Sequence, residues 1–212
     1  MDQNDVKLAV VVGAGVMGHS IAHVFAQAGI EVNLVDLNQV VLERAMGLIH
    51  ANLETLAEFE RISKDDIPGV VTRIHPFTDL AAGAKGAYFA VEAVSEVPEI
   101  KREVFSQLDQ FLPPHAVIAS NTSSLDIFGI PRISRPERLV VAHWFAPPHI
   151  IPLVEVVPGP ETSSESVQFT ANLMRRLGKR TDSEEVSGPG TTSTRGMMWG
   201  GANQCATTRR SG

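Results

Sequence analysis

The sequence of 212 residues contains a single cysteine, Cys205, and therefore cannot form a disulfide bond within the chain. It has no apolar run of roughly 18 residues, so no membrane-spanning helix is predicted. Basic residues are not in excess, because the formal net charge is -6 at pH 7, and this charge disfavours nucleic acids and anionic membranes as partners. The first residues, MDQNDVK, lack the basic and apolar segments of a signal peptide, so we expect a cytoplasmic location. No set of side chains has the spacing of a metal site, and none is predicted.

Short apolar runs rich in Val and Ile alternate with longer amphipathic segments along most of the chain. This alternation is typical of an α/β fold with a doubly wound, mostly parallel sheet of the Rossmann type and helices on both of its faces. Strands are expected at 7–13, 30–36, 86–94, 115–121, 138–144 and 151–157, and helices at 14–29, 37–62, 99–112 and 163–178. Three helices have a predicted inner stripe: Val16, Met17, Ile21, Val24 and Phe25; Ile100, Val104, Leu108 and Phe111; Val167, Thr170, Leu173, Met174 and Leu177.

Periodicity ends near residue 180, because the remaining residues are dominated by Gly, Ser, Thr and Arg. We therefore expect one folded domain over residues 1–180 and a disordered or aberrant tail over residues 181–212. No internal repeat is apparent in the folded part.

Three glycines, Gly13, Gly15 and Gly18, have the G-x-G-x-x-G spacing directly after the first predicted strand and at the start of the first predicted helix. In this context Gly13 would make the tight turn, Gly15 would let the backbone approach a pyrophosphate, and Gly18 would let the helix pack against the strand. The turn, with Ala14, Val16 and Met17 between the glycines, is therefore predicted to bind a dinucleotide. The alternative is a glycine-rich connection without a ligand.

Asp36 lies at the end of the next predicted strand, where an acidic residue binds the adenosine ribose in dinucleotide-binding folds. Its charge would repel the 2′-phosphate of NADP, and no arginine follows it, so NAD is the predicted cofactor. The alternative is that Asp36 only caps the helix that follows.

His143 ends a predicted strand, and Glu155 lies on the next strand beyond a proline-containing turn. A histidine of near-neutral pKa can take the proton of an alcohol that gives a hydride to NAD. Glu155 could orient the imidazole ring and stabilise its protonated form. His149 lies nearby and is a rival for the base, and a surface role for His143 is an alternative on spacing alone.

Several motifs together resemble the NAD-binding domain of the 3-hydroxyacyl-CoA dehydrogenase family over roughly residues 5–180. They are GAGVMG, VEAVSE, SNTSSL and the stretch from His143 to Glu155, which are twelve residues apart. The resemblance implies that His143 and Glu155 are the catalytic pair and that Ser123 hydrogen-bonds the substrate oxygen. It also implies cofactor contacts by Glu96, Lys101 and Asn121. The alternative for Ser123 and Ser124 is a helix cap ahead of LDIFGI.

The implied reaction is the NAD-dependent oxidation of a 3-hydroxyacyl-CoA to its 3-oxoacyl product, in fatty-acid metabolism. Ala146 departs from the family, which usually has asparagine there, and PPHIIPLVEVVPGPET is more similar to the branch containing lambda-crystallin and L-gulonate dehydrogenase. A free 3-hydroxy acid such as L-gulonate is therefore an alternative substrate.

The family continues into a helical domain that supplies its dimer interface and one wall of the active cleft. The sequence after Lys179 begins similarly and then diverges. We therefore expect this domain and the dimer interface to be absent, as in a truncated or frame-shifted product. An NAD-binding module without turnover is a further alternative.

Overall fold

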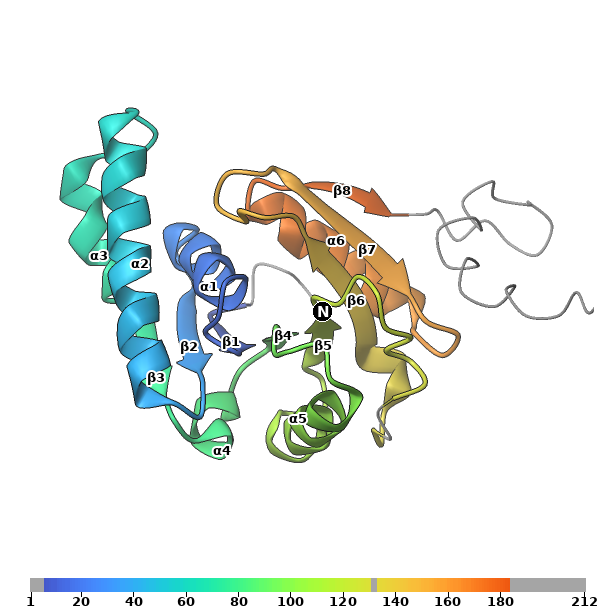
Figure 1. Ribbon diagram of the computed structural model, residues 1–212. Coiled ribbons are helices and arrows are strands. Elements are labelled where there is room, and N and C mark those ends of the chain that lie inside the picture. The colour runs from blue at the N-terminus through green and yellow to red at the C-terminus, as the bar shows by residue number, and fades with distance from the viewer. Residues whose placement is uncertain (1–5, 131–132, 184–212) are drawn as a thin grey trace, which may run out of the picture.

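The computed structural model describes residues 6–130 and 133–183, which form one eight-stranded sheet with helices on both faces (Figure 1). The strand order is β3-β2-β1-β4-β5-β6-β7-β8. The strands are β1 (Leu8–Val12), β2 (Glu31–Val35), β3 (Ile74–Phe77), β4 (Phe89–Glu92), β5 (Val117–Ser120), β6 (Leu139–Trp144), β7 (Leu153–Pro158) and β8 (Arg180–Ser183). The helices are α1 (Gly18–Gln27), α2 (Gln39–Glu58), α3 (Ile67–Val71), α4 (Leu80–Ala84), α5 (Pro98–Phe111) and α6 (Ser164–Arg176), with short 3-10 turns η2 (Lys64–Asp66) and η3 (Pro136–Arg138).

The sheet confirms the predicted mostly parallel, doubly wound architecture. Strands β3, β2, β1, β4, β5 and β6 pair in parallel, whereas β7 is antiparallel to β6. The central strands β1, β4 and β5 are apolar except for Glu92 and Ser120 at their carboxyl ends, because helices cover both faces of the sheet. The carboxyl ends of β1, β2, β4, β5 and β6 consequently lie along one edge, where open α/β sheets bind their ligands.

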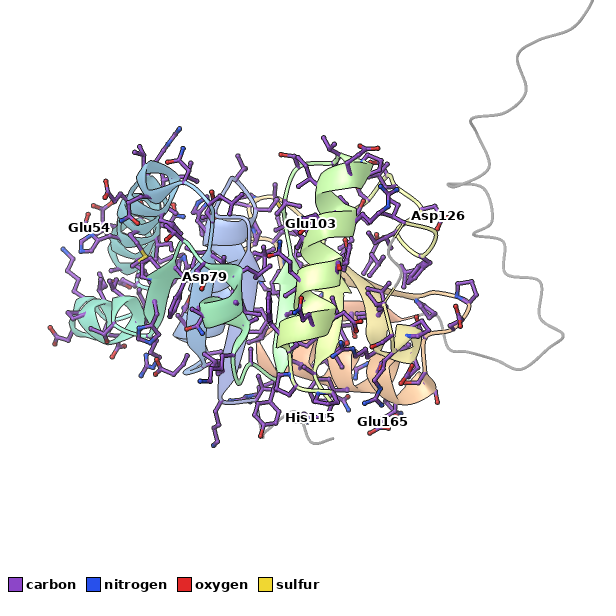
Figure 2. All side chains as sticks on the ribbon, turned by 90° about the horizontal axis from the view of Figure 1, so that it is seen from below. Glu54, Asp79, Glu103, His115, Asp126 and Glu165 are labelled. Carbon is purple, nitrogen blue, oxygen red and sulfur yellow. The ribbon has the colours of Figure 1, made fainter. Side chains whose placement is uncertain are left out.

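Two apolar cores lie on opposite faces of the sheet. One contains Ile21 and Phe25 of α1, Leu53 of α2 and Leu173 of α6, whereas the other contains Phe105 of α5. Figure 1 shows α5 on the opposite side of the sheet from α1 and α6. In the view of Figure 2, α5 lies in front of the strands and its Glu103 side chain is at the surface, as is Asp79 at the start of α4.

The predicted inner stripe of α6 is confirmed, since all five of its residues are buried. The predicted inner stripes of α1 and α5 are each wrong at their first residue. Helix α1 begins only at Gly18, and Val16 before it is 79% exposed. Ile100 of α5 is 45% exposed, while Lys101 beside it is buried. The apolar stem of a lysine can pack in a core when its charge is paired, so the buried face of α5 is rotated toward Lys101.

Strand β3 and helices α3 and α4 were not predicted, because they are only four or five residues long. Strand β3 contains Pro76, which is tolerated there because β3 lies at the sheet edge. Strand β8 also extends past the predicted domain boundary, so residues 181–183 of the expected tail belong to the sheet. The rest of that tail, residues 184–212, lies outside the described residues. Within the described part, no helix is both long and apolar enough to cross a bilayer.

Candidate NAD-binding and catalytic site

The glycine turn after β1 has the geometry expected of a dinucleotide-binding turn. Gly13 has a φ of +97°, and a Cβ there would lie 2.6 Å from the Ala93 carbonyl oxygen. A Cβ on Gly18 would collide with the Gly13 carbonyl oxygen, so α1 packs directly against the turn. A Cβ on Gly15, by contrast, would meet no atom within 4 Å. The first and last glycines are thus needed by the fold, and the middle one leaves backbone open to a ligand.

Asp36 follows β2 and faces this turn. Its Oδ2 accepts a hydrogen bond from the Ala14 N–H at 3.0 Å, and its Oδ1 accepts one from Asn38 N–H at 3.1 Å. Asn38, whose side chain accepts from Val40 N–H, is the residue that caps α2. The interpretation of Asp36 as only a helix cap is therefore wrong. The carboxylate is partly exposed beside the turn, where it can also accept hydrogen bonds from ribose hydroxyls.

Replacing Asp36 by Ala is expected to weaken NAD binding and to reduce the preference for NAD over NADP. Each hydrogen bond from a ribose hydroxyl to the charged carboxylate contributes about 1.5 to 3 kcal/mol. Calorimetric titrations of both cofactors against the wild type and the variant measure the two effects. Equal affinity of the wild-type protein for NAD and NADP would show that Asp36 does not select the cofactor.

Glu92, at the end of β4, is a buried carboxylate that the sequence analysis did not identify. It accepts hydrogen bonds from Lys101 Nζ at 2.7 Å, Ser120 Oγ at 2.6 Å and Val94 N–H at 2.9 Å. Glu92 is 0% exposed and Lys101 is 1% exposed. A buried charge requires such compensation, so this network joins the ends of β4 and β5 to the start of α5. A glutamate inside an otherwise apolar strand, with a lysine on the helix that follows, was the available signal.

The cofactor contacts implied for Glu96 and Lys101 remain predictions. Glu96 Oε2 accepts from Thr122 Oγ1 at 2.8 Å and stays close to half exposed at the edge of the sheet. The Lys101 side chain points instead into its ion pair with Glu92, with the Glu96 carboxylate 3.7 Å away.

Replacing Lys101 by Met is expected to lower the free energy of unfolding by about 3 to 5 kcal/mol, because Glu92 would be left as an unpaired buried charge. Urea unfolding followed by circular dichroism measures this loss. Arg102 on the exposed side of α5 offers a matched control, and Arg102→Met should be nearly neutral. A stable Lys101→Met protein with weakened NAD binding would instead favour a direct cofactor contact.

His143 and Glu155 form the pair that the sequence analysis predicted. They are register partners on the antiparallel strands β6 and β7, and the distance between His143 Nδ1 and Glu155 Oε2 is 3.1 Å. Their side chains are 21% and 38% exposed. With Nδ1 donating to the carboxylate, Nε2 of a neutral His143 ring is an acceptor. The pair therefore has the arrangement of a general base with an orienting acid.

Asn121 and Ser123, after β5, differ in their surroundings. The Asn121 side-chain oxygen accepts from Trp144 N–H at 3.0 Å and so ties the ends of β5 and β6 together. Ser123 is exposed, and its substrate contact remains a prediction. The alternative of a helix cap at Ser123 or Ser124 is wrong, because no helix follows: residues 125–130 form bends and a turn at 127–129, and Thr122 Oγ1 accepts from Leu125 N–H.

His149, the rival candidate, lies away from Glu155 and packs on α1. Its Nδ1 is 3.2 Å from Ser20 Oγ, and its ring stacks on His23 with centroids 5.3 Å apart. Burial, and secondarily the neighbouring His149, lower the pKa of His23 to about 4.

Between pH 6.5 and about 4, unfolded His23 binds a proton that folded His23 does not, so acidification through this window should destabilise the fold. The loss for this one group amounts to about 3 kcal/mol once both pKa values are passed. His23→Phe should remove that part of the pH dependence. Urea unfolding of both proteins at several pH values tests this, and parallel pH profiles would contradict it.

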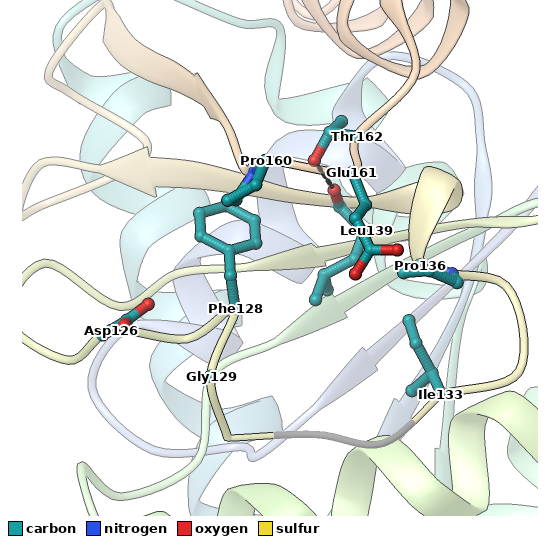
Figure 3. A pocket seen from close by; sticks show the side chains of 9 residues that line it. All are labelled: Asp126, Phe128, Gly129, Ile133, Pro136, Leu139, Pro160, Glu161 and Thr162. Atoms are coloured by element: carbon teal, nitrogen blue, oxygen red, sulfur yellow. Dashed lines mark hydrogen bonds between the residues drawn. The ribbon is translucent and has the colours of Figure 1, made fainter.

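A separate hollow lies where β6 begins and β7 ends, opposite the end of β6 that carries His143 (Figure 3). It is lined by Asp126, Phe128, Gly129, Ile133, Pro136, Leu139, Pro160, Glu161 and Thr162. Its lining carries two acidic side chains and no basic one, so it offers no cationic side chain to the phosphates of a dinucleotide. Within the described residues, no group of three or more His, Cys, Asp or Glu side chains could hold a metal ion.

Residues 8–182 match the family model described as the 3-hydroxyacyl-CoA dehydrogenase, NAD binding domain. The chain belongs to this family. The domain that this model describes binds NAD, and the open turn at Gly15 and the carboxylate of Asp36 fit that cofactor.

Relatives of this NAD-binding domain include 3-hydroxyadipyl-CoA dehydrogenase of Escherichia coli (strain K12), 36% identical over 177 residues. That alignment covers 83% of this chain and 37% of the relative. A probable 3-hydroxybutyryl-CoA dehydrogenase of Bacillus subtilis (strain 168) is 34% identical over 195 residues, 92% of this chain and 67% of the relative. The crystal structure of 3-hydroxybutyryl-CoA dehydrogenase from Escherichia coli K12 superimposes with a TM-score of 0.80 at 35% identity, covering 84% of this chain and 38% of that one. The chain thus spans between about one third and two thirds of the length of these relatives.

Proposed function

We propose that this chain catalyses the NAD-dependent oxidation of a 3-hydroxyacyl-CoA to the 3-oxoacyl-CoA, with His143 as the general base. The observation that carries the proposal is the His143–Glu155 pair on adjacent strands, at the sheet edge that also carries the glycine turn and Asp36. The names of two relatives, 3-hydroxyadipyl-CoA dehydrogenase and probable 3-hydroxybutyryl-CoA dehydrogenase, support this substrate class.

In the proposed step, Nε2 of neutral His143 takes the proton of the substrate hydroxyl as the O–H bond breaks. NAD held by the glycine turn and Asp36 would supply the hydride acceptor for the carbon that bears this hydroxyl, and the loss of proton and hydride would leave a carbonyl group on the substrate. Glu155 accepts the hydrogen bond from His143 Nδ1 and stabilises the imidazolium that forms.

The oxygen of the 3-hydroxyl group must be held while its proton leaves. Ser123, exposed beside the end of β5, is the hydroxyl donor proposed for this role. A neutral hydroxyl can hold a carbonyl or alcohol oxygen without competing for the proton that His143 receives.

The experiment that tests the proposal compares 3-hydroxybutyryl-CoA with L-gulonate as substrates and records the formation of NADH. Turnover of the CoA ester alone would support the proposal, and turnover of L-gulonate alone would replace the substrate class. Absence of both activities, with NAD binding retained, would instead show a binding module without turnover.

A further inference from the structure

The loop that joins the strands of His143 and Glu155, residues 145–152, reaches α1 beside the glycine turn. Its His149 contributes Nδ1 to a contact of 3.2 Å with Ser20 Oγ, and Ser20 is 2% exposed. The catalytic strands and the cofactor turn, far apart in sequence, are thus connected through one side-chain contact. Neither the proposed proton transfer nor the proposed cofactor contacts use His149 or Ser20.

The contact continues through His19 to the backbone of the turn. Both ring nitrogens of His19 contact an oxygen. Nε2 lies 3.2 Å from Ser20 Oγ, and Nδ1 lies 2.7 Å from the Gly15 carbonyl oxygen. A carbonyl oxygen can only accept, so His19 Nδ1 carries a proton and donates it. In the neutral ring Nε2 then accepts from the Ser20 hydroxyl. Ser20 Oγ in turn accepts from His149 Nδ1, so that each hydrogen bond in the series from His149 to Gly15 has an assigned donor and acceptor.

The Gly15 carbonyl is coupled to the ligand side of the turn through peptide geometry. In a planar trans peptide, the carbonyl oxygen of one residue and the N–H of the next point in opposite directions. Holding the Gly15 oxygen toward His19 therefore directs the Val16 N–H away from His19. Gly15 and Val16 are exposed, so that N–H lies on the open side of the turn, where a pyrophosphate would be bound.

The loop around His149, where this series of hydrogen bonds begins, is held in place by Lys179, which is 8% exposed. Its Nζ donates to the Pro148 carbonyl at 2.6 Å and to the Ile151 carbonyl at 3.0 Å, on the two sides of His149. Burial, followed by the charges of His19 and Lys179, lowers the pKa of His149 and favours its neutral ring. His149 is therefore a fixed hydrogen-bond donor to Ser20.

We propose that His149, acting through Ser20 and His19, positions the Gly15–Val16 peptide, so that NAD affinity depends on the loop between the catalytic strands. This inference rests on the proposed NAD site and adds three positioning residues to it. Occupation of the cofactor turn and the placement of the His143–Glu155 hairpin then favour each other, since linkage between two sites is reciprocal.

Calorimetric titration with NAD tests the coupling. His149→Leu and Ser20→Ala should each raise the dissociation constant about three- to tenfold, the range expected for one lost hydrogen bond. His149→Asn, whose amide can donate from the position of Nδ1, should restore most of the affinity. His50→Leu is the matched control, because His50 lies on α2 with a side chain 53% exposed, and it should leave the dissociation constant unchanged.

The outcomes separate the coupling from the proposed function. Wild-type affinity in His149→Leu and Ser20→Ala would overturn the coupling alone. Absence of NAD binding by the wild-type protein would overturn both the coupling and the proposed function. Nitrogen-15 NMR of the histidine rings is a second test that needs no NAD. His19 and His149 should both carry their proton on Nδ1, and Ser20→Ala should change the His149 signal. Protons on Nε2 of both rings would overturn the inferred chain.

Discussion

Replacing His143 by Gln is expected to reduce turnover of 3-hydroxybutyryl-CoA by about 10² to 10⁴-fold, the usual contribution of a general base. Glutamine keeps a polar group near Glu155 but cannot take the substrate proton. The NAD dissociation constant should change little, because the glycine turn and Asp36 lie on other strands of the sheet. Initial rates and calorimetry on the same preparations measure the two effects.

Glu155→Gln gives the companion measurement. It retains a hydrogen-bonding oxygen but removes the charge that stabilises the imidazolium, so the acidic limb of the pH–rate profile should move to lower pH. The same profile in both proteins would mean that Glu155 does not act on His143. His149→Leu is a useful comparison, since the proposed proton transfer does not involve His149, and the His143 variant should lose far more turnover.

Replacing Gly15 by Val and Gly18 by Ala is expected to separate binding from folding. A side chain on Gly15 meets no neighbouring atom within 4 Å, so the fold should survive while NAD affinity falls about 10- to 100-fold, as expected when backbone hydrogen bonds to a charged group are blocked. The Cβ of Gly18→Ala would collide with the Gly13 carbonyl oxygen, and stability should fall by about 3 kcal/mol or more.

Thermal unfolding and NAD titration of both variants test this contrast. Gly47→Ala is a control for the added Cβ, because Gly47 lies in α2 and its Cβ would also meet no atom within 4 Å. A stable Gly15→Val protein that binds NAD like the wild type would remove the glycine turn from the cofactor site.

The parts of the site that the sequence predicted are those with local signals. The turn could be recognised because its three glycines, the strand before them and the helix after them are contiguous. His143 and Glu155 could be paired because a hairpin places residues of neighbouring strands opposite each other, which the register confirms. The resemblance to a known family then favoured His143 over His149, and the geometry places only His143 beside Glu155.

The parts that the sequence did not predict depend on contacts between distant segments. Glu92 is paired with Lys101 on α5 and accepts a hydrogen bond from Ser120 on β5, and apolar periodicity gives no information on such contacts. The buried residues of α5 accordingly include Lys101, which an apolar stripe cannot predict. Strand β8 lacked a signal because, as an edge strand, it is held by backbone pairing with β7, not by an alternating pattern.

Transfer of an isotope from the substrate to the cofactor tests whether the hydride passes directly between them. 3-Hydroxybutyryl-CoA carrying deuterium on the carbon that bears the hydroxyl would be incubated with the protein and NAD, and the cofactor would be analysed by mass spectrometry. We expect the wild-type protein to produce reduced cofactor that carries the deuterium, and His143→Gln to produce it at a rate about 10² to 10⁴-fold lower. Reduced cofactor without deuterium would rule out direct hydride transfer, and equal rates of labelling in the two proteins would rule out His143 as the general base.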